Sequence, residues 1–117
     1  MARVPDILYQ GQPGTADTAL YTVPAGKKAT ITAIHACNTD TATKYFSAHL
    51  VQNGGAVADA TAMAKLQKLV GTSDATGGGT WDWEIPLPLN TVGDKISGIQ
   101  ETATAITVTI IGFEEAV

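Results

Sequence analysis

Alternation of apolar and polar residues with period two, broken at short intervals by glycine, proline, asparagine and aspartate, dominates this sequence. The clearest alternation runs over 81–89, with apolar residues on one face and acidic residues or prolines on the other: Trp81, Trp83, Ile85, Leu87 and Leu89 against Asp82, Glu84, Pro86 and Pro88. Successive side chains of a β-strand point to opposite faces, so this pattern predicts strands with one buried face. Many short strands separated by turn residues are typical of a sandwich or barrel. We therefore predict an all-β protein, a single β-sandwich or jelly-roll-like domain of about seven or eight antiparallel strands.

The same pattern places the expected strands at about 19–23, 28–38, 44–51, 81–89, 95–100 and 105–113. The strand over 28–38 does not alternate cleanly, which predicts a β-bulge or burial on both of its faces. Prolines cannot donate to a ladder, so the strand over 81–89 should lie at a sheet edge or stop by Glu84. The corner 24–26, Pro-Ala-Gly, should be a β-turn, because proline presets φ and glycine supplies a positive φ.

Two parts of the chain keep open alternatives. The segment 56–70 fits either a helix capped by Asp59, or a loop or one helical turn followed by a strand; the second suits the surrounding β pattern. Residues 1–12 are expected to form an N-terminal arm, and 13–117 the sandwich domain, since 117 residues make one domain. The arm either pairs with a partner or forms the first strand of its own sheet.

Charge and hydropathy exclude several classes of partner. The net charge of −4 and the pI near 4.8 argue against nucleic-acid binding, which needs a basic face. No stretch approaches the roughly 18 apolar residues of a membrane span, and the N-terminus lacks a signal-peptide core, so we expect folding in a cytoplasm. Charged residues make up only 15%, which indicates that a partner covers part of the surface. The single cysteine, Cys37, cannot form an internal disulfide and is expected to be a small buried side chain.

No set of residues reaches the pattern of an enzyme, so we expect no catalytic residue, no cofactor and no metal site. The stretch around Gly26 and Lys27 lacks the first glycine and the hydroxyl residue of a phosphate-binding loop. None of the serines lies in a Gly-x-Ser-x-Gly turn. His35 and His49 lack tight His-x-His spacing and are expected to be ordinary surface or hydrogen-bonded histidines. A small metal-dependent enzyme stays an alternative only if these two histidines meet.

A sugar-binding alternative attaches to the strand over 81–89. Asp82 and Glu84 share one face about 7 Å apart, which superficially suits a glycosidase pair. Trp81 and Trp83 beside them suggest a carbohydrate-binding module, which requires at least one exposed tryptophan. We favour the structural explanation, in which the tryptophans point into the core and the acids keep an edge strand soluble.

Several turn motifs carry a resemblance to a known family. The corner 22–27 reads Thr-Val-Pro-Ala-Gly-Lys, and the strand after it ends at 37–39 in Cys-Asn-Thr. Leu-Val at 50–51 precedes a glycine loop, 93–96 reads Gly-Asp-Lys-Ile, and the last strand ends at 110–114 in Ile-Ile-Gly-Phe-Glu. Over roughly 21–114 the chain resembles small β-sandwich structural proteins of tailed-bacteriophage virions. The shared motifs are turn chemistry rather than active-site chemistry, and the 77–79 glycine loop and the paired tryptophans depart from the pattern.

The resemblance implies a virion component made in the host bacterial cytoplasm. It implies a head decoration (cement) protein that binds across capsid subunits and stabilises the head, with a tail or neck protein as the alternative. The implied partners are the major capsid protein or other virion proteins, and a trimer or dimer would suit capsid symmetry axes. The expected partner contacts are the apolar residues of the arm and the loop glycines: Ile7, Leu8, Tyr9, Gly77, Gly78 and Gly79.

Overall fold

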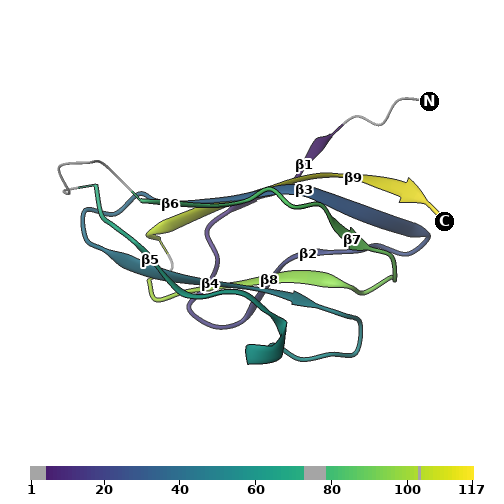
Figure 1. The fold of residues 1–117 in the computed structure, drawn as a ribbon, viewed down its shortest axis with the longest axis horizontal. Coiled ribbons are helices and arrows are strands. Elements are labelled where there is room, and N and C mark those ends of the chain that lie inside the picture. Colours follow the sequence, from purple (N-terminus) through teal and green to yellow (C-terminus); the bar gives the residue numbers. More distant parts are fainter. Residues whose placement is uncertain (1–4, 73–78, 103) are drawn as a thin grey trace.

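Two antiparallel β-sheets packed face to face make up the protein (Figure 1). The computed structural model describes residues 5–72, 79–102 and 104–117, and the one helical element within them is a 3₁₀ turn, η1 (Asp59–Thr61). Sheet A, the upper layer in Figure 1, contains five strands: β1 (Asp6–Gly11), β9 (Ile106–Ala116), β3 (Lys27–Asn38), β6 (Thr80–Trp83) and β7 (Leu87–Leu89). Sheet B, the lower layer, contains four: β2 (Thr18–Thr22), β8 (Lys95–Gln100), β4 (Lys44–Val51) and β5 (Ala62–Leu69). The predicted all-β sandwich is confirmed.

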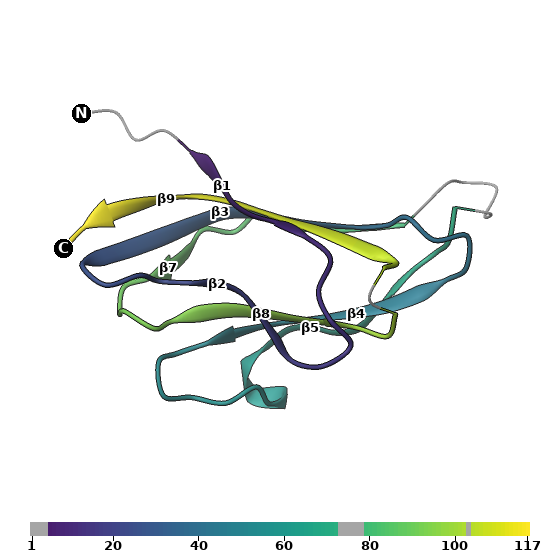
Figure 2. The ribbon, with the colours of Figure 1, turned by 180° about the vertical axis from the view of Figure 1, so that it is seen from behind.

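The order of the strands is that of a double-sheet jelly roll. Sheet A runs β1-β9-β3-β6, with β7 also paired to β3, and sheet B runs β2-β8-β4-β5. Most consecutive strands therefore cross from one sheet to the other, and only β4 and β5 pair as sequence neighbours within a sheet. Figure 2 shows β1 and β2 at the same side of the sandwich, each at the edge of its sheet.

The pairing of β3 with β9 forms the centre of sheet A. It extends from Lys27 opposite Ala116 to Asn38 opposite Ile106, with a register shift between Ile31 and Ala33. This shift is the β-bulge predicted for 28–38. The inward-facing side chains of the two strands are almost completely buried and form the middle of the core: Ile31, Ile34, Ala36, Ile106, Val108 and Ile110.

The strand predicted over 81–89 is divided in two, which raises the number of strands to nine. β6 pairs with β3 over 80–83, and β7 pairs with β3 over 87–89. The residues between them, which include Pro86, leave the ladder. Both parts of the prediction are confirmed, since the strand stops before Glu84 and lies at the edge of sheet A.

Other local predictions are also confirmed by the structure. The Pro-Ala-Gly corner joins β2 to β3, with Gly26 at φ 77° and a hydrogen bond of 3.2 Å from the Lys27 N–H to the Pro24 carbonyl. In the segment 56–70, the helical turn η1 is followed by strand β5, as the second alternative predicted. The strand begins at Ala62 and not at Leu66, where it was expected to begin. Residues Asp6–Gly11 of the arm form a strand of the protein's own sheet, which was one of the two alternatives, because they pair with β9 in sheet A.

Side chains with polar groups close the ends of the sandwich. The buried Asn38 amide donates to the carbonyls of Leu69 (2.8 Å) and Ala42 (2.9 Å). The buried Asp94 carboxylate accepts the N–H groups of Asn53 (2.9 Å) and Thr91 (3.2 Å). Both residues belong to the turn motifs of the family resemblance, so these motifs build the fold.

Helices long and apolar enough to cross a membrane are absent from the part of the chain that the structure describes.

Gly112 lies where β9 passes the bulge of β3, and an alanine there is expected to destabilise the protein strongly. An added Cβ would lie 2.2 Å from the Thr30 carbonyl oxygen and 3.1 Å from the Ile31 Cα, so the two strands must separate. We expect Gly112→Ala to lower the free energy of unfolding by about 3 kcal/mol, measured by urea denaturation. As a control, Gly26→Ala meets no atom within 4 Å and should cost only its backbone strain, about 1 kcal/mol. Equal losses in the two variants would contradict this explanation.

Tyr21 links the two sheets, because its hydroxyl donates to the Glu114 carboxylate across the core edge at 2.5 Å. Burial, and then the hydrogen bond and the negative charge of Glu114, raise the pKa of Tyr21 above its usual range. A raised pKa in the folded state gives stability that is complete below pH about 10 and decreases as the pH rises above it. We expect Tyr21→Phe to flatten this alkaline decrease in the free energy of unfolding. Tyr45→Phe, at an exposed tyrosine, should keep the wild-type slope.

Candidate interaction surfaces

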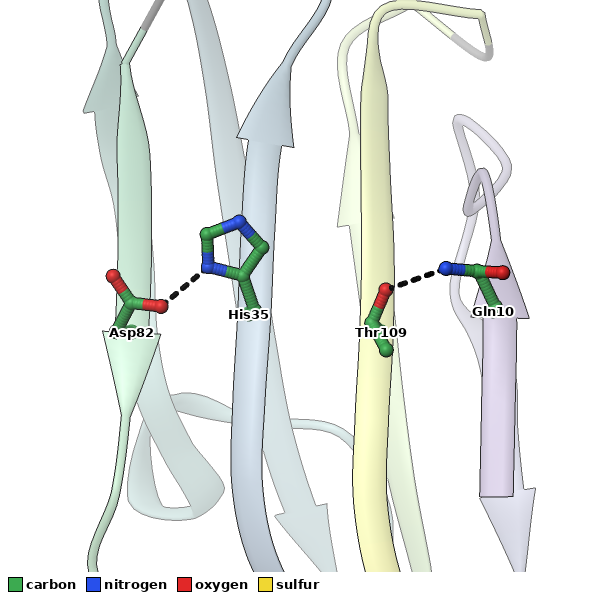
Figure 3. A network of polar contacts seen from close by, with 4 residues as sticks. All are labelled: Gln10, His35, Asp82 and Thr109. Carbon is green, nitrogen blue, oxygen red and sulfur yellow. Dashed lines mark hydrogen bonds and ion pairs between the residues drawn. The ribbon is translucent and has the colours of Figure 1, made fainter. Parts of the chain in front are cut away.

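A row of polar side chains crosses the outer face of sheet A (Figure 3). His35 of β3 lies opposite Thr109 of β9 on one side and opposite Asp82 of β6 on the other. The His35 Nδ1 atom is hydrogen-bonded to an Asp82 carboxylate oxygen, and the Gln10 amide donates to the Thr109 hydroxyl at 3.2 Å. The row thus connects four strands through outward-facing side chains, and both members of the His35–Asp82 pair remain about half exposed.

Apolar side chains lie beside this row on the same face. Ile7 of β1 is opposite Ile111 of β9, which is in turn opposite Ala33 of β3. Ile7 is 57% exposed, whereas Ile111 and Ala33 are half-buried. The face combines small, apolar and polar groups, a composition suited to contact with another protein.

The predicted partner contacts take different places in the structure. Ile7 points outward, while Leu8 and Tyr9 are partly buried and pack against the core, and burial raises the pKa of Tyr9. Gly79 is structural: its N–H donates to the Val70 carbonyl at 2.8 Å, and an added Cβ would lie 2.5 Å from the Val70 nitrogen. The predicted contacts Gly77 and Gly78 lie outside the described residues.

The two tryptophans of β6 turn toward the core, as the structural explanation predicted. Trp81 packs against Phe46 with ring centroids 5.9 Å apart, and the Trp83 indole N–H donates to the Ile85 carbonyl at 2.9 Å. Asp82 and Glu84 are exposed. Both indole rings are partly buried against the core, which leaves less of their faces open to stack on a sugar ring.

The structure separates the two histidines. His35 lies on the outer face of sheet A, whereas His49 belongs to β4 of sheet B, is buried, and contacts the Thr61 hydroxyl at 3.2 Å. Within residues 5–72, 79–102 and 104–117, no three His, Cys, Asp or Glu side chains gather closely enough to hold a metal ion. The prediction that Cys37 is buried needs correction, because its side chain is half-buried and faces outward, opposite Thr107. The residues before and after it in β3, Ala36 and Asn38, are the ones that point inward.

A groove of about 370 Å³ lies on the outer face of sheet B. The chain between β4 and β5 folds back under this sheet, as Figure 1 shows, and buries part of its outer face, including His49. The groove occupies a neighbouring part, where Ser47 of β4 lies opposite Ile99 of β8. We call it the sheet B groove; seven residues line it: Thr15, Tyr45, Ser47, Leu66, Ile99, Gln100 and Glu101.

Leu66 forms one wall of the sheet B groove in a strained conformation. It has φ +50°, and among the described residues other than glycine no second one has a positive φ. The register of β5 explains this geometry: Phe46 is opposite Gln67 and Ala48 is opposite Ala64, so two residues of β5 face Ser47 alone. The Leu66 N–H donates to the Ser47 hydroxyl at 2.9 Å, and its side chain is 66% exposed.

Sequence reasoning did not identify the sheet B groove. The segment 56–70 had no clear periodicity, and a bulge that turns one leucine outward leaves little trace in the sequence. The one signal is an isolated leucine between Lys65 and Gln67. An exposed apolar residue between polar ones does not by itself distinguish a wall of a groove from a solvent-facing side chain.

Replacing Leu66 by a residue that tolerates positive φ is expected to stabilise the protein. Asparagine adopts this backbone region more readily than leucine, and little buried area is lost because the side chain is exposed. We expect Leu66→Asn to raise the free energy of unfolding by about 0.5–1 kcal/mol. Ile85→Asn, at a similarly exposed position (63%) with no positive φ, should change it by less than about 0.5 kcal/mol. A destabilised Leu66→Asn protein would show that the leucine packs usefully in the free molecule.

Comparison with solved structures agrees with the architecture. A chain in a structure of infectious bursal disease virus Gx strain is similar, with a TM-score of 0.51 and 12% sequence identity. The match covers 98% of this chain and 32% of that chain, so this chain spans about a third of the length of the viral one. At this identity the similarity shows the fold alone. No family model and no curated protein sequence matches the chain.

Two further solved structures are similar over most of their length. One comes from Bacillus endospore appendages, described as a family of disulfide-linked pili; it has 14% identity and a TM-score of 0.46, covering 97% of this chain and 88% of that one. The other is a virus-like particle of the giant freshwater prawn Macrobrachium rosenbergii extra small virus, with 6% identity, a TM-score of 0.47, and coverage of 100% and 82%. Both TM-scores lie below 0.5.

Proposed function

We propose that this protein is a structural component of a virus particle, and specifically a decoration protein of a tailed-bacteriophage head. In this role it binds across neighbouring capsid subunits, has no catalytic activity and carries no cofactor. The tail or neck of the virion is the alternative location. The turn motifs of the sequence support the family, and the jelly-roll order of the strands is compatible with it.

One observation carries the proposal: large apolar side chains are exposed on both sides of a sandwich that has few charges. Ile7 is exposed on the outer face of sheet A, and Tyr45 and Leu66 are exposed on that of sheet B. Only 15% of the residues are charged. Exposed apolar groups on a weakly charged surface are typical of an interface that another protein covers.

The dimensions of the molecule suit this role. Its extents are 47 × 32 × 20 Å, and in the view down the shortest axis the sheets lie one above the other, so each outer face spans the longest and the shortest dimension. Such a face is comparable in area with one side of a standard interface, about 800 Å². Binding that bridges two capsid subunits would add its free energy to the stability of the assembled head. The negative charge would keep the protein from packaged or released DNA.

A carbohydrate-binding module is less well supported, because Trp81 and Trp83 pack on the core. That alternative predicts a change in tryptophan fluorescence when glycans are added.

The test is association with capsids. We expect the purified protein to sediment with undecorated heads at a fixed ratio, and antibodies raised against it to label virus particles in electron micrographs. Light scattering of the free protein would give its oligomeric state, for which we expect a trimer or dimer. Labelling confined to tails would favour the tail or neck alternative. A protein that binds no part of the particle would exclude the proposed function.

A further inference from the structure

We propose that the sheet B groove binds an extended segment of a capsid subunit, in which an apolar side chain stands next to a lysine or arginine. The inference rests on the proposed function, and it names the part of the partner that the decoration protein recognises. Three observations carry it: the apolar lining, the strained wall and the acidic end of the groove.

The apolar lining defines the first half of the occupant. Leu66 is 66% exposed and Tyr45 is 40% exposed, and they lie around a floor made by Ile99 and Ser47. A volume of about 370 Å³ admits a large aliphatic or aromatic side chain. Such a side chain would remove the exposed parts of Leu66 and Tyr45 from water, which is the main source of binding free energy at interfaces of this kind.

The strained conformation of Leu66 supports a binding role for the sheet B groove. A positive φ is unfavourable for leucine, and it persists here because β5 is bulged and the Leu66 N–H is bonded to the Ser47 hydroxyl. Together these features hold an apolar side chain out in solvent beside the groove. Strain of this kind is commonly found at sites that bind a partner.

The acidic end of the groove defines the second half of the occupant. One oxygen of the Glu101 carboxylate accepts the Tyr45 N–H at 3.1 Å, which fixes the carboxylate at the end of the apolar floor. Within the described residues no lysine, arginine or histidine forms an ion pair with Glu101. A cation from a partner would therefore find an exposed carboxylate already held in place.

The outer face of sheet A is the competing surface, and it fits a partner less specifically. The acidic member of its polar row, Asp82, is already bonded to His35. Its exposed isoleucine, Ile7, lies on the face itself and does not line the sheet B groove. A contact there would depend on area, whereas the sheet B groove has both a shape and a charge to complement.

The experiment measures binding of single variants to undecorated capsids by sedimentation at two salt concentrations. We expect Leu66→Asn to weaken binding about tenfold or more, although the same change should not destabilise the free protein. We expect Glu101→Gln to weaken binding about threefold and to reduce its dependence on salt. The matched controls are Ile85→Asn for the exposed apolar residue and Glu84→Gln for the exposed acid, and both should bind within about twofold of wild type.

A photo-crosslinking side chain at position 45 identifies the occupant. The expected product joins this position to a capsid-subunit peptide that contains an apolar residue next to lysine or arginine. A cross-link to a second copy of this chain, or to a capsid peptide without a basic residue, would overturn the proposed occupant.

The outcomes separate the two proposals. If wild-type protein binds no capsid, the proposed function fails, and the capsid segment fails with it. If wild type binds and the Leu66 and Glu101 variants bind equally well, decoration stands and the sheet B groove is excluded as the contact. Loss of binding in Ile85→Asn alone would assign the contact to the edge of sheet A.

Discussion

The structure depends on the pairing of β3 with β9, which runs almost the full length of both strands. Its inward side chains fill the centre of the core, and every other strand of sheet A pairs with one of these two. The bulge between Ile31 and Ala33 lets the long ladder bend, and Gly112 permits the close approach that the bend requires. Sheet B then packs beneath this pair, and Tyr21 bridges the layers through Glu114. Because the inner faces of both sheets form the core, only the outer faces are available for contact with a partner.

Much of this arrangement could be predicted from the sequence, because alternation reports directly on burial. The limits of β4 and β8, the bulge in β3 and the edge position of β6 all follow from period two, proline and glycine. Features set by contacts between distant segments could not be predicted. Cys37 sits in an apolar context, yet its direction depends on the register with β9. The conformation of Leu66 depends on the pairing of β5 with β4, which no local pattern encodes.

The two outer faces are built differently, and the difference has a functional meaning. On the outer face of sheet A, Gln10 is hydrogen-bonded to Thr109 and His35 to Asp82, and each pair joins two strands. Sheet B is partly covered by the chain between β4 and β5 and, next to this cover, is open as the groove beside Leu66 and Glu101. A surface whose hydrogen bonds are internal contributes area and little selectivity, while a groove with an exposed carboxylate held at one end would contribute selectivity.

The strand order also determines when the protein can fold during its synthesis. Gln10 and Thr109 are hydrogen-bonded neighbours although they lie 99 residues apart in the sequence. Strand β9 lies between β1 and β3 in sheet A. Neither β1 nor β3 can pair with it until the ribosome has made residues 106–116. Until then the apolar faces of the earlier strands stay exposed and can associate with those of other unfinished chains. The lysines at 65 and 68 on the edge strand β5, Pro86 between β6 and β7, and Pro88 within β7 discourage pairing between such chains during this interval.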